Sequence, residues 1–247
     1  MIFRIYQAVE LAPGVEVNLD KDAVNHIVNV LRLKTDDSLI IFNGEGGEYS
    51  AEIIQIKRRE VKVRINTFQN INRESNLNIH LAQGVSLGEK MDFILQKVTE
   101  LGVAEITPLI TARCNVKLSK DRWDKKISRW QKIIISACEQ CGRNILPRLN
   151  QAINFADFVA QNEAAAKIIL HPAAKSVLSD LDVKQNEVSV LIGPEGGFST
   201  EELQLAEQHN FLSVKLGPRI LRTETAGLAI TSILQAQCGD LGSDMLH

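Results

Sequence analysis

The sequence predicts two parts of different fold class, a small β-barrel and then an α/β domain with a parallel sheet. The first seventy residues consist mostly of β-rich stretches separated by turn glycines. After a polar linker at 69–76, short β-branched runs alternate with helical patterns, which is typical of parallel strands covered by helices on both faces. We therefore expect a first domain at residues 1–70 and a second domain at residues 77–247.

The barrel is predicted from three β-rich stretches in the first part of the chain. They are SLIIF, GEYSAEIIQI and VKVRINT, of which the last alternates apolar and polar residues cleanly. One helix interrupts this part, beginning at an N-cap on Asp20 and running through Leu31. Its spacing predicts an apolar side made of Ala23, Val24, Ile27, Val30 and Leu31.

The second part alternates strands and helices in order along the chain. The predicted strands are LNIHLAQGV, AEITPLI, AKIILH, EVSVLIG and SVKLG. A helix closed by Gly102 follows the first strand, and a basic helix through Arg143 follows the second. Ser199 and Glu202 fit a capping box, which predicts a helix to about His209. An apolar helix from about Thr223 to Gln237 ends the domain.

Composition is that of an ordinary globular protein. Among 247 residues, 45% are hydrophobic and 23% are charged, which excludes a disordered chain. The N-terminus lacks the features of a secretory signal, and no apolar run approaches membrane-spanning length, so we expect a cytoplasmic protein. Reduced cysteines suit that compartment. Cys138 and Cys141 form a CxxC without a second ligand pair, so we expect ordinary thiols and no metal site.

Positive charge is concentrated in one segment although the net charge is only −2. From Arg113 to Arg148 the chain has ten Lys or Arg residues against three acids. Trp123 and Trp130 lie seven positions apart, on one helical face. The segment therefore has the electrostatic character of a surface that meets phosphates, and the alternative is a solvated helix face over a buried tryptophan stripe.

Three unusual loops follow predicted strands in the last third of the chain. They are His171-Pro172, GPEGGF from Gly193, and GPRILRTET from Gly217. Ligands bind beyond the carboxyl ends of strands in open α/β sheets, so these loops are the candidate site. GPEGGF lacks the Lys-Ser/Thr ending of a P-loop, and a dinucleotide fold would place its glycine loop after the first strand. For GPEGGF alone, a plain tight turn is the alternative.

Four stretches, taken together and in order, resemble a bacterial family that methylates N3 of a uridine in small-subunit (16S) ribosomal RNA. They are EKMDFILQKVTELGVAEITPL, ACEQCGRNILP, IGPEGGFSTEE and LGPRILRTETA. This family belongs to the SPOUT superfamily of methyltransferases. The resemblance extends from HIVNVLR in the barrel to the last helix, and so covers nearly the whole chain.

The resemblance implies a PUA-like N-terminal β-barrel and an α/β methyltransferase domain with a deep trefoil knot. It also implies an obligate homodimer, the small ribosomal subunit as partner, and S-adenosylmethionine as methyl donor. The loop GPEGGF is then one of the knot loops that hold this donor. The donor-binding residues implied by the resemblance are Leu170, His171, Gly193, Glu195, Gly197, Leu216, Ile220 and Leu221.

Methyl transfer to uridine N3 requires loss of the N3 proton, so a carboxylate and an arginine are the expected catalytic groups. Glu224 and Arg222 lie beside the last loop, and we expect them to orient the base and stabilise charge on the uracil oxygens. An ion pair and helix cap is the alternative role for them. Residues expected to contact RNA are Arg4, Arg32, Arg113 and Arg143.

Two other functions remain open on the sequence alone. The first is methylation of another RNA position by an enzyme of the same superfamily, at a ribose 2′-hydroxyl or a guanine. The second is a noncatalytic RNA-binding or assembly protein that uses the same surfaces. A noncatalytic protein has no need to bind S-adenosylmethionine, so donor binding distinguishes it from an enzyme. The identity of the methylated atom distinguishes a uridine methyltransferase from an enzyme that acts on another RNA position.

Overall fold

The computed structural model describes residues 3–114, 119–178 and 186–242. The chain forms two compact units, one of residues 1–74 with 135–146 and the other of residues 75–134 with 147–247. Residues 135–146, which the sequence assigned to the second domain, therefore group with the first unit. The domain boundaries expected at residues 70 and 77 remain a prediction.

The first unit contains a five-stranded sheet in the order β1-β3-β4-β5-β2. β1 runs parallel to β3, and the other pairs are antiparallel. Side chains from alternate strand positions, such as Ile41 and Val63, form one fully buried core. The strands are β1 (Phe3–Tyr6), β2 (Glu16–Asn18), β3 (Ser38–Phe42), β4 (Glu48–Lys57) and β5 (Glu60–Gln69).

The helix expected in this unit is present but changes its winding midway. Its N-cap is Asp20, whose carboxylate accepts a hydrogen bond from the Ala23 amide. The α-helix α1 (Lys21–Asn25) continues as a π-helix, η1 (His26–Leu31). The wider π turn carries Val30 off the apolar side, and its side chain is 64% exposed. The prediction that Val30 faces the core was therefore wrong.

The second unit is built on an eight-stranded sheet whose main order is β11-β13-β10-β12-β6-β7-β8, with β9 also paired to β7. All its pairings are parallel, as the alternation of strands and helices predicted. The strands are β6 (Asn78–Gly84), β7 (Glu105–Ile110), β8 (Arg148–Leu149), β9 (Ile153–Asn154), β10 (Ala166–Leu170), β11 (Ser176–Val177), β12 (Glu187–Ile192) and β13 (Leu212–Lys215).

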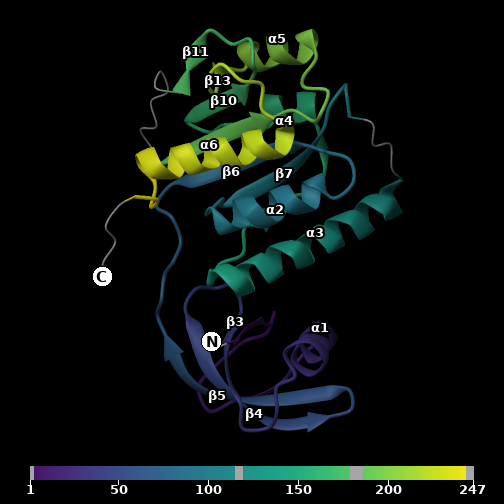
Figure 1. Cartoon of the computed structure of the whole chain (residues 1–247), viewed down its shortest axis with the longest axis vertical. Helices are drawn as coiled ribbons and strands as arrows, with labels where there is room; N and C mark the ends of the chain where they lie inside the picture. Colours follow the sequence, from purple (N-terminus) through teal and green to yellow (C-terminus); the bar gives the residue numbers. More distant parts are fainter. Residues whose placement is uncertain (1–2, 115–118, 179–185, 243–247) are drawn as a thin grey trace. The chain divides into compact units, whose positions relative to one another are not determined.

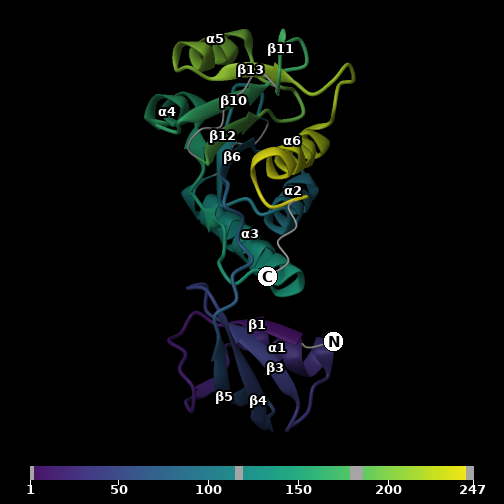
Figure 2. The same ribbon diagram turned by 90° about the vertical axis from the view of Figure 1, so that its left-hand side faces the viewer.

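Helices cover both faces of this sheet, as Figures 1 and 2 show. α2 (Lys90–Glu100) packs against α6 (Thr223–Cys238) on one face. On the other face lies α4 (Phe155–Gln161), which contacts α5 (Thr200–Gln208). A cluster that includes Phe158, Ile169 and Leu191 forms the core beneath α4 and α5. Each face therefore has its own apolar layer.

The predicted helix ends are largely confirmed by their capping geometry. Both hydrogen bonds of the Ser199–Glu202 capping box are present at the start of α5. Gly102, just beyond α2, has a φ of +81°, a conformation that glycine adopts without strain. The basic helix α3 (Lys120–Cys141) ends two residues before the predicted limit at Arg143. In the part of the chain that the structure describes, no helix is long and apolar enough to cross a membrane.

Candidate functional site

A pocket of about 540 Å³ lies at the carboxyl edge of the sheet in the second unit. Its walls are the segments that follow β10, β12 and β13, which are neighbours in the strand order. The three loops singled out in the sequence therefore meet at one place, because adjacent parallel strands end at the same edge. The first turns of α6 close the pocket from the side.

All eight residues expected to bind the donor line this pocket. They do so together with both expected catalytic residues and with Arg113, which the sequence analysis assigned to RNA. The lining residues among those predicted are Leu170, His171, Gly193, Glu195, Gly197, Leu216, Ile220, Leu221, Arg222, Glu224 and Arg113.

The loop after β12 favours glycine at two positions, for different reasons. Gly197 has a φ of +66° and open space around its missing side chain. Gly193 has an ordinary φ, but a Cβ there would lie 3.0 Å from the Gly197 Cα atom. The loop therefore turns back on itself, and the Gly197 amide donates to the Pro194 carbonyl across a distance of 2.9 Å.

Side chains from the neighbouring loops hold this glycine loop in place. The Glu195 carboxylate accepts hydrogen bonds from the Leu87 amide and the Lys90 ammonium, both at 3.1 Å. Burial raises the pKa of Glu195, but the hydrogen bonds to its carboxylate outweigh burial and hold the pKa below its ordinary value. Arg113 donates to the Gly196 carbonyl at 2.8 Å. Glu195 and Arg113 thus anchor the loop while they line the pocket.

Two further residues, which the sequence analysis did not single out, lie beneath the loop. The Thr223 hydroxyl donates to the Gly193 carbonyl at 2.6 Å, and the Gln83 amide group donates to the Thr223 hydroxyl at 2.9 Å. Gln83 is fully buried at the end of β6. The available signal in the sequence was a polar residue, Gln83, directly after the apolar pair Leu81 and Ala82 at the end of a predicted strand.

The loop after β13 presents side chains on the open side of the pocket. Gly217 has a φ of +74°, which makes the turn after the strand. Ile220 is 81% exposed although it is apolar, and Arg222 beside it is also exposed. One oxygen of the Glu224 carboxylate is buried without a hydrogen-bond partner. Such an atom is unusual in a folded protein and marks a position where a polar group could bind.

The expected RNA-binding arginines lie in different environments. Arg113 is exposed at the pocket, and Arg32 is exposed at the end of η1, with a φ of +56°. Arg4 and Arg143 instead have buried side chains that form ion pairs with Glu48 and Glu74 within the first unit. These carboxylates already neutralise the two arginines, so the structure gives both side chains a role in stabilising the fold.

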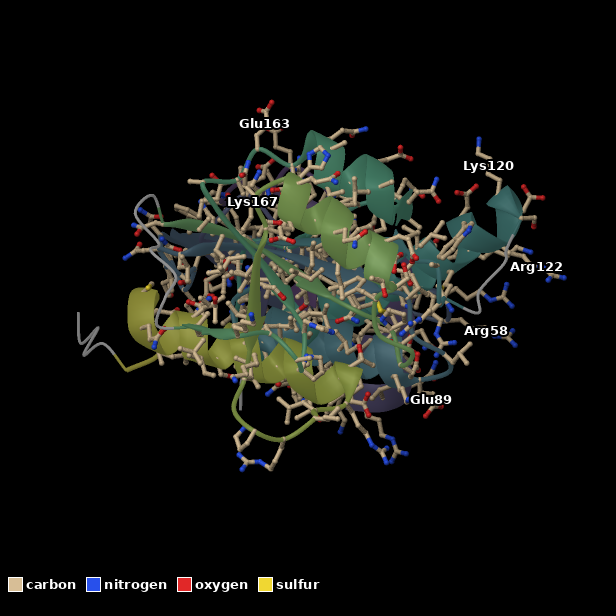
Figure 3. The ribbon with its side chains drawn as sticks, turned by 90° about the horizontal axis from the view of Figure 1, so that it is seen from above. Arg58, Glu89, Lys120, Arg122, Glu163 and Lys167 are labelled. Carbon is tan, nitrogen blue, oxygen red and sulfur yellow. The ribbon has the colours of Figure 1, made fainter. Side chains whose placement is uncertain are left out.

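The basic helix α3 has a buried tryptophan and exposed basic residues, which both alternatives left open by the sequence predict. Trp130 is buried, and its indole N–H donates to Asp92 of α2 at 3.1 Å, as a structural tryptophan does. Arg129 pairs with the same carboxylate group. Lys120 and Arg122, by contrast, point away from the molecule at the start of the helix (Figure 3). Lys117, in the same basic segment, is outside the described residues.

The composition of the pocket restricts the ligand it can accept. Its volume lies in the range of small-molecule sites, and its lining combines apolar side chains, charged side chains and the glycine loops. Such a lining suits an organic molecule that has both apolar and polar or charged parts. In the residues that the structure describes, no group of His, Cys, Asp or Glu could hold a metal ion.

Comparison with known protein families identifies both units. Residues 73–235 match an RNA methyltransferase domain, and residues 19–66 match an RNA methyltransferase PUA domain. The predicted fold class, an α/β methyltransferase domain preceded by a PUA-like domain, is thereby confirmed.

Relatives align over nearly their full length. A ribosomal RNA small subunit methyltransferase E from Buchnera aphidicola is 41% identical and covers 96% of this chain and 97% of its own. The protein of that name from Bacillus subtilis is 32% identical, with 96% of each chain covered.

Two solved structures have the same fold throughout. A methyltransferase from Legionella pneumophila, solved with S-adenosylmethionine bound, has a TM-score of 0.95 and 48% identity over 97% of this chain and 99% of its own. The small subunit methyltransferase E of Neisseria gonorrhoeae, also bound to S-adenosylmethionine, has a TM-score of 0.90 and 36% identity over the same shares. With the domain matches and the full-length relatives, these likenesses show that the chain belongs to the ribosomal RNA small subunit methyltransferase E family.

Proposed function

We propose that this protein transfers a methyl group from S-adenosylmethionine to N3 of a uridine in the RNA of the small ribosomal subunit. The observation that supports this most directly is the convergence of three loops on one 540 Å³ pocket, in a family whose relatives bind that donor. When bound, S-adenosylmethionine supplies a methyl group that is ready for in-line displacement by a nucleophile.

The residues of the pocket fit this donor. Leu170, Leu216 and Leu221 offer apolar contact, and the backbone of Gly193 and Gly197 approaches closely enough to hydrogen-bond to polar atoms. No triphosphate has to be held, so the missing P-loop lysine is expected. Because Glu195 accepts hydrogen bonds from Leu87 and Lys90, we assign it the role of holding the loop.

Arg222 and Glu224 are the proposed catalytic pair. They stand at the start of α6, on the wall of the same pocket. The Glu224 oxygen without a partner can accept the N3 proton or orient the base, and Arg222 can stabilise negative charge on the uracil oxygens. The target base has to leave its stack to reach them, since N3 lies on the pairing edge.

Contact with ribosomal RNA is proposed for exposed basic residues. Arg113 lies at the pocket and suits contact near the target base, while Arg32 and the first turns of α3 suit phosphates. Contact of Arg4 and Arg143 with RNA remains an expectation that competes with their ion pairs. A ribosomal RNA substrate also supports the cytoplasmic location expected from the sequence.

A homodimer is the proposed assembly. α2 and α6 pack side by side and leave Phe93 and Ile233 exposed, at 45% and 37%. Obligate interfaces are apolar, and this face offers such side chains. Light scattering at low micromolar concentration should give the mass of a dimer. A monomer with full activity would contradict this assembly.

The proposed reaction is tested by digesting methylated small-subunit RNA to nucleosides and identifying the product by mass spectrometry. We expect N3-methyluridine with the wild-type protein, and rates at least about 100-fold lower with Arg222→Gln and Glu224→Gln. Donor affinity of both variants, measured by calorimetry, should stay within about threefold of wild type if their role is catalytic. A methylated ribose or guanine would contradict the uridine assignment. Absence of donor binding by the wild type would contradict an enzymatic role.

A further inference from the structure

A short chain of hydrogen bonds connects β6, the glycine loop and the start of α6 beneath the donor pocket. It runs from the Gln83 amide nitrogen to the Thr223 hydroxyl, and from that hydroxyl to the Gly193 carbonyl. Gln83 is fully buried and does not line the pocket. Any influence of Gln83 on the donor must therefore pass through Thr223 or through the Gly193 carbonyl, which the Gln83 amide nitrogen also approaches directly at 3.5 Å.

The direction of these hydrogen bonds is fixed by counting protons. The Thr223 hydroxyl has one proton, which it donates to the Gly193 carbonyl. The hydroxyl oxygen can therefore only accept from Gln83, so the amide NH₂ group must face it. The second N–H of that group donates to the Gly84 carbonyl at 3.0 Å. Rotating the amide by half a turn would place the amide oxygen against the Gly84 carbonyl and the Thr223 oxygen, which both act as acceptors here, so both hydrogen bonds would be lost.

This orientation leaves the other end of the Gln83 amide unsatisfied. Its oxygen is buried without a hydrogen-bond partner. It faces Gly227 of α6, where an added Cβ would lie 3.5 Å away. A buried polar atom without a partner is costly, and such atoms in a native structure call for an explanation. An apolar residue of similar shape at position 83 would avoid that cost, but it would also remove both donors.

We propose that Gln83 and Thr223 are positioning residues for methyl transfer, which set the Gly193 end of the donor loop against the start of α6. This inference rests on the proposed function. Gln83 does not line the pocket, whereas Thr223 lies on its wall at the start of α6, and neither is assigned a chemical role in the transfer. The pair fixes the carbonyl that begins the donor loop relative to the turn of α6 that carries Arg222 and Glu224. The donor and the catalytic groups are thereby held in a fixed position relative to each other, which in-line displacement requires.

Close packing around Gln83 and Thr223 shows why a hydrogen bond, rather than a bulky side chain, has to set the position of the donor loop relative to α6. A Cβ at Gly84 would lie 2.5 Å from the Pro194 nitrogen, so β6 and the donor loop already touch at their backbones. No side chain could fit between them at that point. Gln83, one residue earlier, reaches the Gly193 carbonyl mainly through Thr223, because its direct hydrogen bond to that carbonyl is long, at 3.5 Å.

The test uses two isosteric substitutions, Gln83→Met and Thr223→Val. The matched controls are Gln235→Met and Thr231→Val, because both controls are buried on α6 and hydrogen-bonded away from the pocket. Gln235 accepts from Ser75 and donates to Gly102, and the Thr231 hydroxyl donates to the Gly227 carbonyl of its own helix. Calorimetry measures donor affinity, steady-state kinetics gives kcat and KM, and thermal unfolding reports stability.

We expect Gln83→Met and Thr223→Val each to weaken donor binding about tenfold and to lower kcat as well. In both variants the donor loop is no longer held in a fixed position relative to the catalytic groups on α6. Thr223→Ser should restore both values to within about threefold, since it keeps the hydroxyl. The double variant should be no worse than either single one, as members of one chain are not additive. The controls should lower the unfolding temperature but leave donor affinity and kcat unchanged.

The outcomes separate this inference from the proposed function. A wild-type protein that binds no donor overturns the proposed function. A wild-type protein that binds and methylates, beside Gln83→Met and Thr223→Val variants with unchanged donor affinity and kcat, overturns the positioning role alone. Equal losses in the matched controls would also overturn it, because the effect would then follow from a loosened core.

Discussion

The two edges of the parallel sheet in the second unit each carry a hollow, and they are built differently. At the carboxyl edge lies the donor pocket of about 540 Å³. At the amino edge, where β6, β7 and β12 begin, lies a larger hollow of about 790 Å³. The second is lined by residues such as His80, Glu105 and Arg148. Volume alone would therefore choose the wrong edge.

Polar groups at the amino edge satisfy one another. Glu105 accepts from Arg148 at 2.7 Å and from Asn150 at 2.6 Å. Asn150 also donates to the Thr107 hydroxyl, which lies 2.7 Å from the imidazole nitrogen of His80. Each side chain of this network has its partner within the network. The side chains of this network are therefore interpreted as structural, although Gln161, Glu163 and Glu187 also line the hollow.

The carboxyl edge differs in its backbone. Strands end there in loops that contain glycines with positive φ, and the pocket is lined by Glu224, one of whose oxygens is buried without a partner. A polar side-chain atom that the protein leaves unsatisfied is available to a ligand. The state of the polar groups, rather than the size of a hollow, therefore distinguishes a binding edge from a structural one.

The largest expected effect comes from the glycines of the donor loop. Gly193→Val would set side-chain atoms against the backbone of Gly197, whose Cα atom would lie 3.0 Å from the new Cβ. Because the loop would have to open, we expect donor affinity to fall at least about 100-fold, as measured by calorimetry. Normal donor binding by this variant would show that the carboxyl-edge loop is not the donor site.

A second glycine gives a matched pair for the same comparison. Gly197 and Gly88 have φ values of +66° and +62°, and a Cβ at either would meet nothing within 4 Å. Only Gly197 lines the pocket. Gly197→Ala and Gly88→Ala should therefore lose a similar amount of stability, about 1 kcal/mol, by thermal unfolding. Only Gly197→Ala should weaken donor binding, and equal donor affinities of the two variants would contradict the distinction between these glycines.

The carboxyl edge could be predicted well from the sequence because its signals are local. Glycine and proline after an apolar β-branched run, and a capping box after Ser199, follow from backbone sterics and hydrogen bonding within a few residues. The convergence of three loops followed from the parallel order of strands. These local signals singled out the three loops, whereas the individual donor residues within them came from the resemblance to the methyltransferase family.

What the sequence missed depends on partners distant along the chain. Gln83 meets Thr223 across 140 positions, and Arg4 meets Glu48 across 44. A single sequence gives the charge of Arg4 but not the carboxylate that neutralises it, so the ion pair of Arg4 with Glu48 could not be predicted. Val30 was missed because a π turn breaks the 3.6-residue period on which its placement rested.

An intermediate effect, on RNA binding, is expected from removing basic side chains on α3, and none from removing Arg148 at the amino edge of the sheet. Arg122 and Lys125 are exposed on α3, whereas Arg148 at the amino edge pairs with Glu105. Arg122→Gln with Lys125→Gln should weaken RNA binding and make the plot of log affinity against log salt shallower by roughly 0.7 for each phosphate that the protein no longer neutralises. Arg148→Gln should leave that slope unchanged. A changed slope for Arg148→Gln would mean that the amino edge also meets RNA.

In that experiment Arg129 and Lys126 are left intact for a structural reason. Arg129 forms an ion pair with Asp92, and Lys126 lies over the Trp130 ring. Reversing either charge would disturb the packing of α3 on α2, and weaker RNA binding could then follow from lower stability alone. Donor affinity of the double variant should equal that of the wild type, and an unchanged salt slope would show that these two charges do not meet phosphates.

The smallest expected effect is a pH dependence of stability at the amino edge. Burial lowers the pKa of the His80 imidazole from its ordinary value of 6.5, although the nearby Glu105 carboxylate opposes this shift and Arg148 adds to it. Between the lowered folded value and 6.5, the unfolded chain binds a proton that the folded chain does not. The contribution of His80 to the free energy of unfolding is therefore complete above the ordinary histidine pKa. It is lost as the pH falls toward the lowered folded pKa, by at most about 1.4 kcal/mol per pH unit.

Urea unfolding of the wild type and of His80→Gln between about pH 5 and 8 isolates this contribution, because the other histidines are common to both proteins. The free energy of unfolding of the wild type should fall more steeply below the ordinary histidine pKa than that of the variant. Glu105 does not produce the same signal. Burial raises its pKa, but hydrogen bonds from Arg148 and Asn150 outweigh burial and hold the pKa below its ordinary value. Its stabilising effect is therefore lost only at more acidic pH, as the carboxylate takes up a proton. Parallel curves for the two proteins would mean that His80 is as well solvated when folded as when unfolded, and that the amino edge is open enough to admit a ligand.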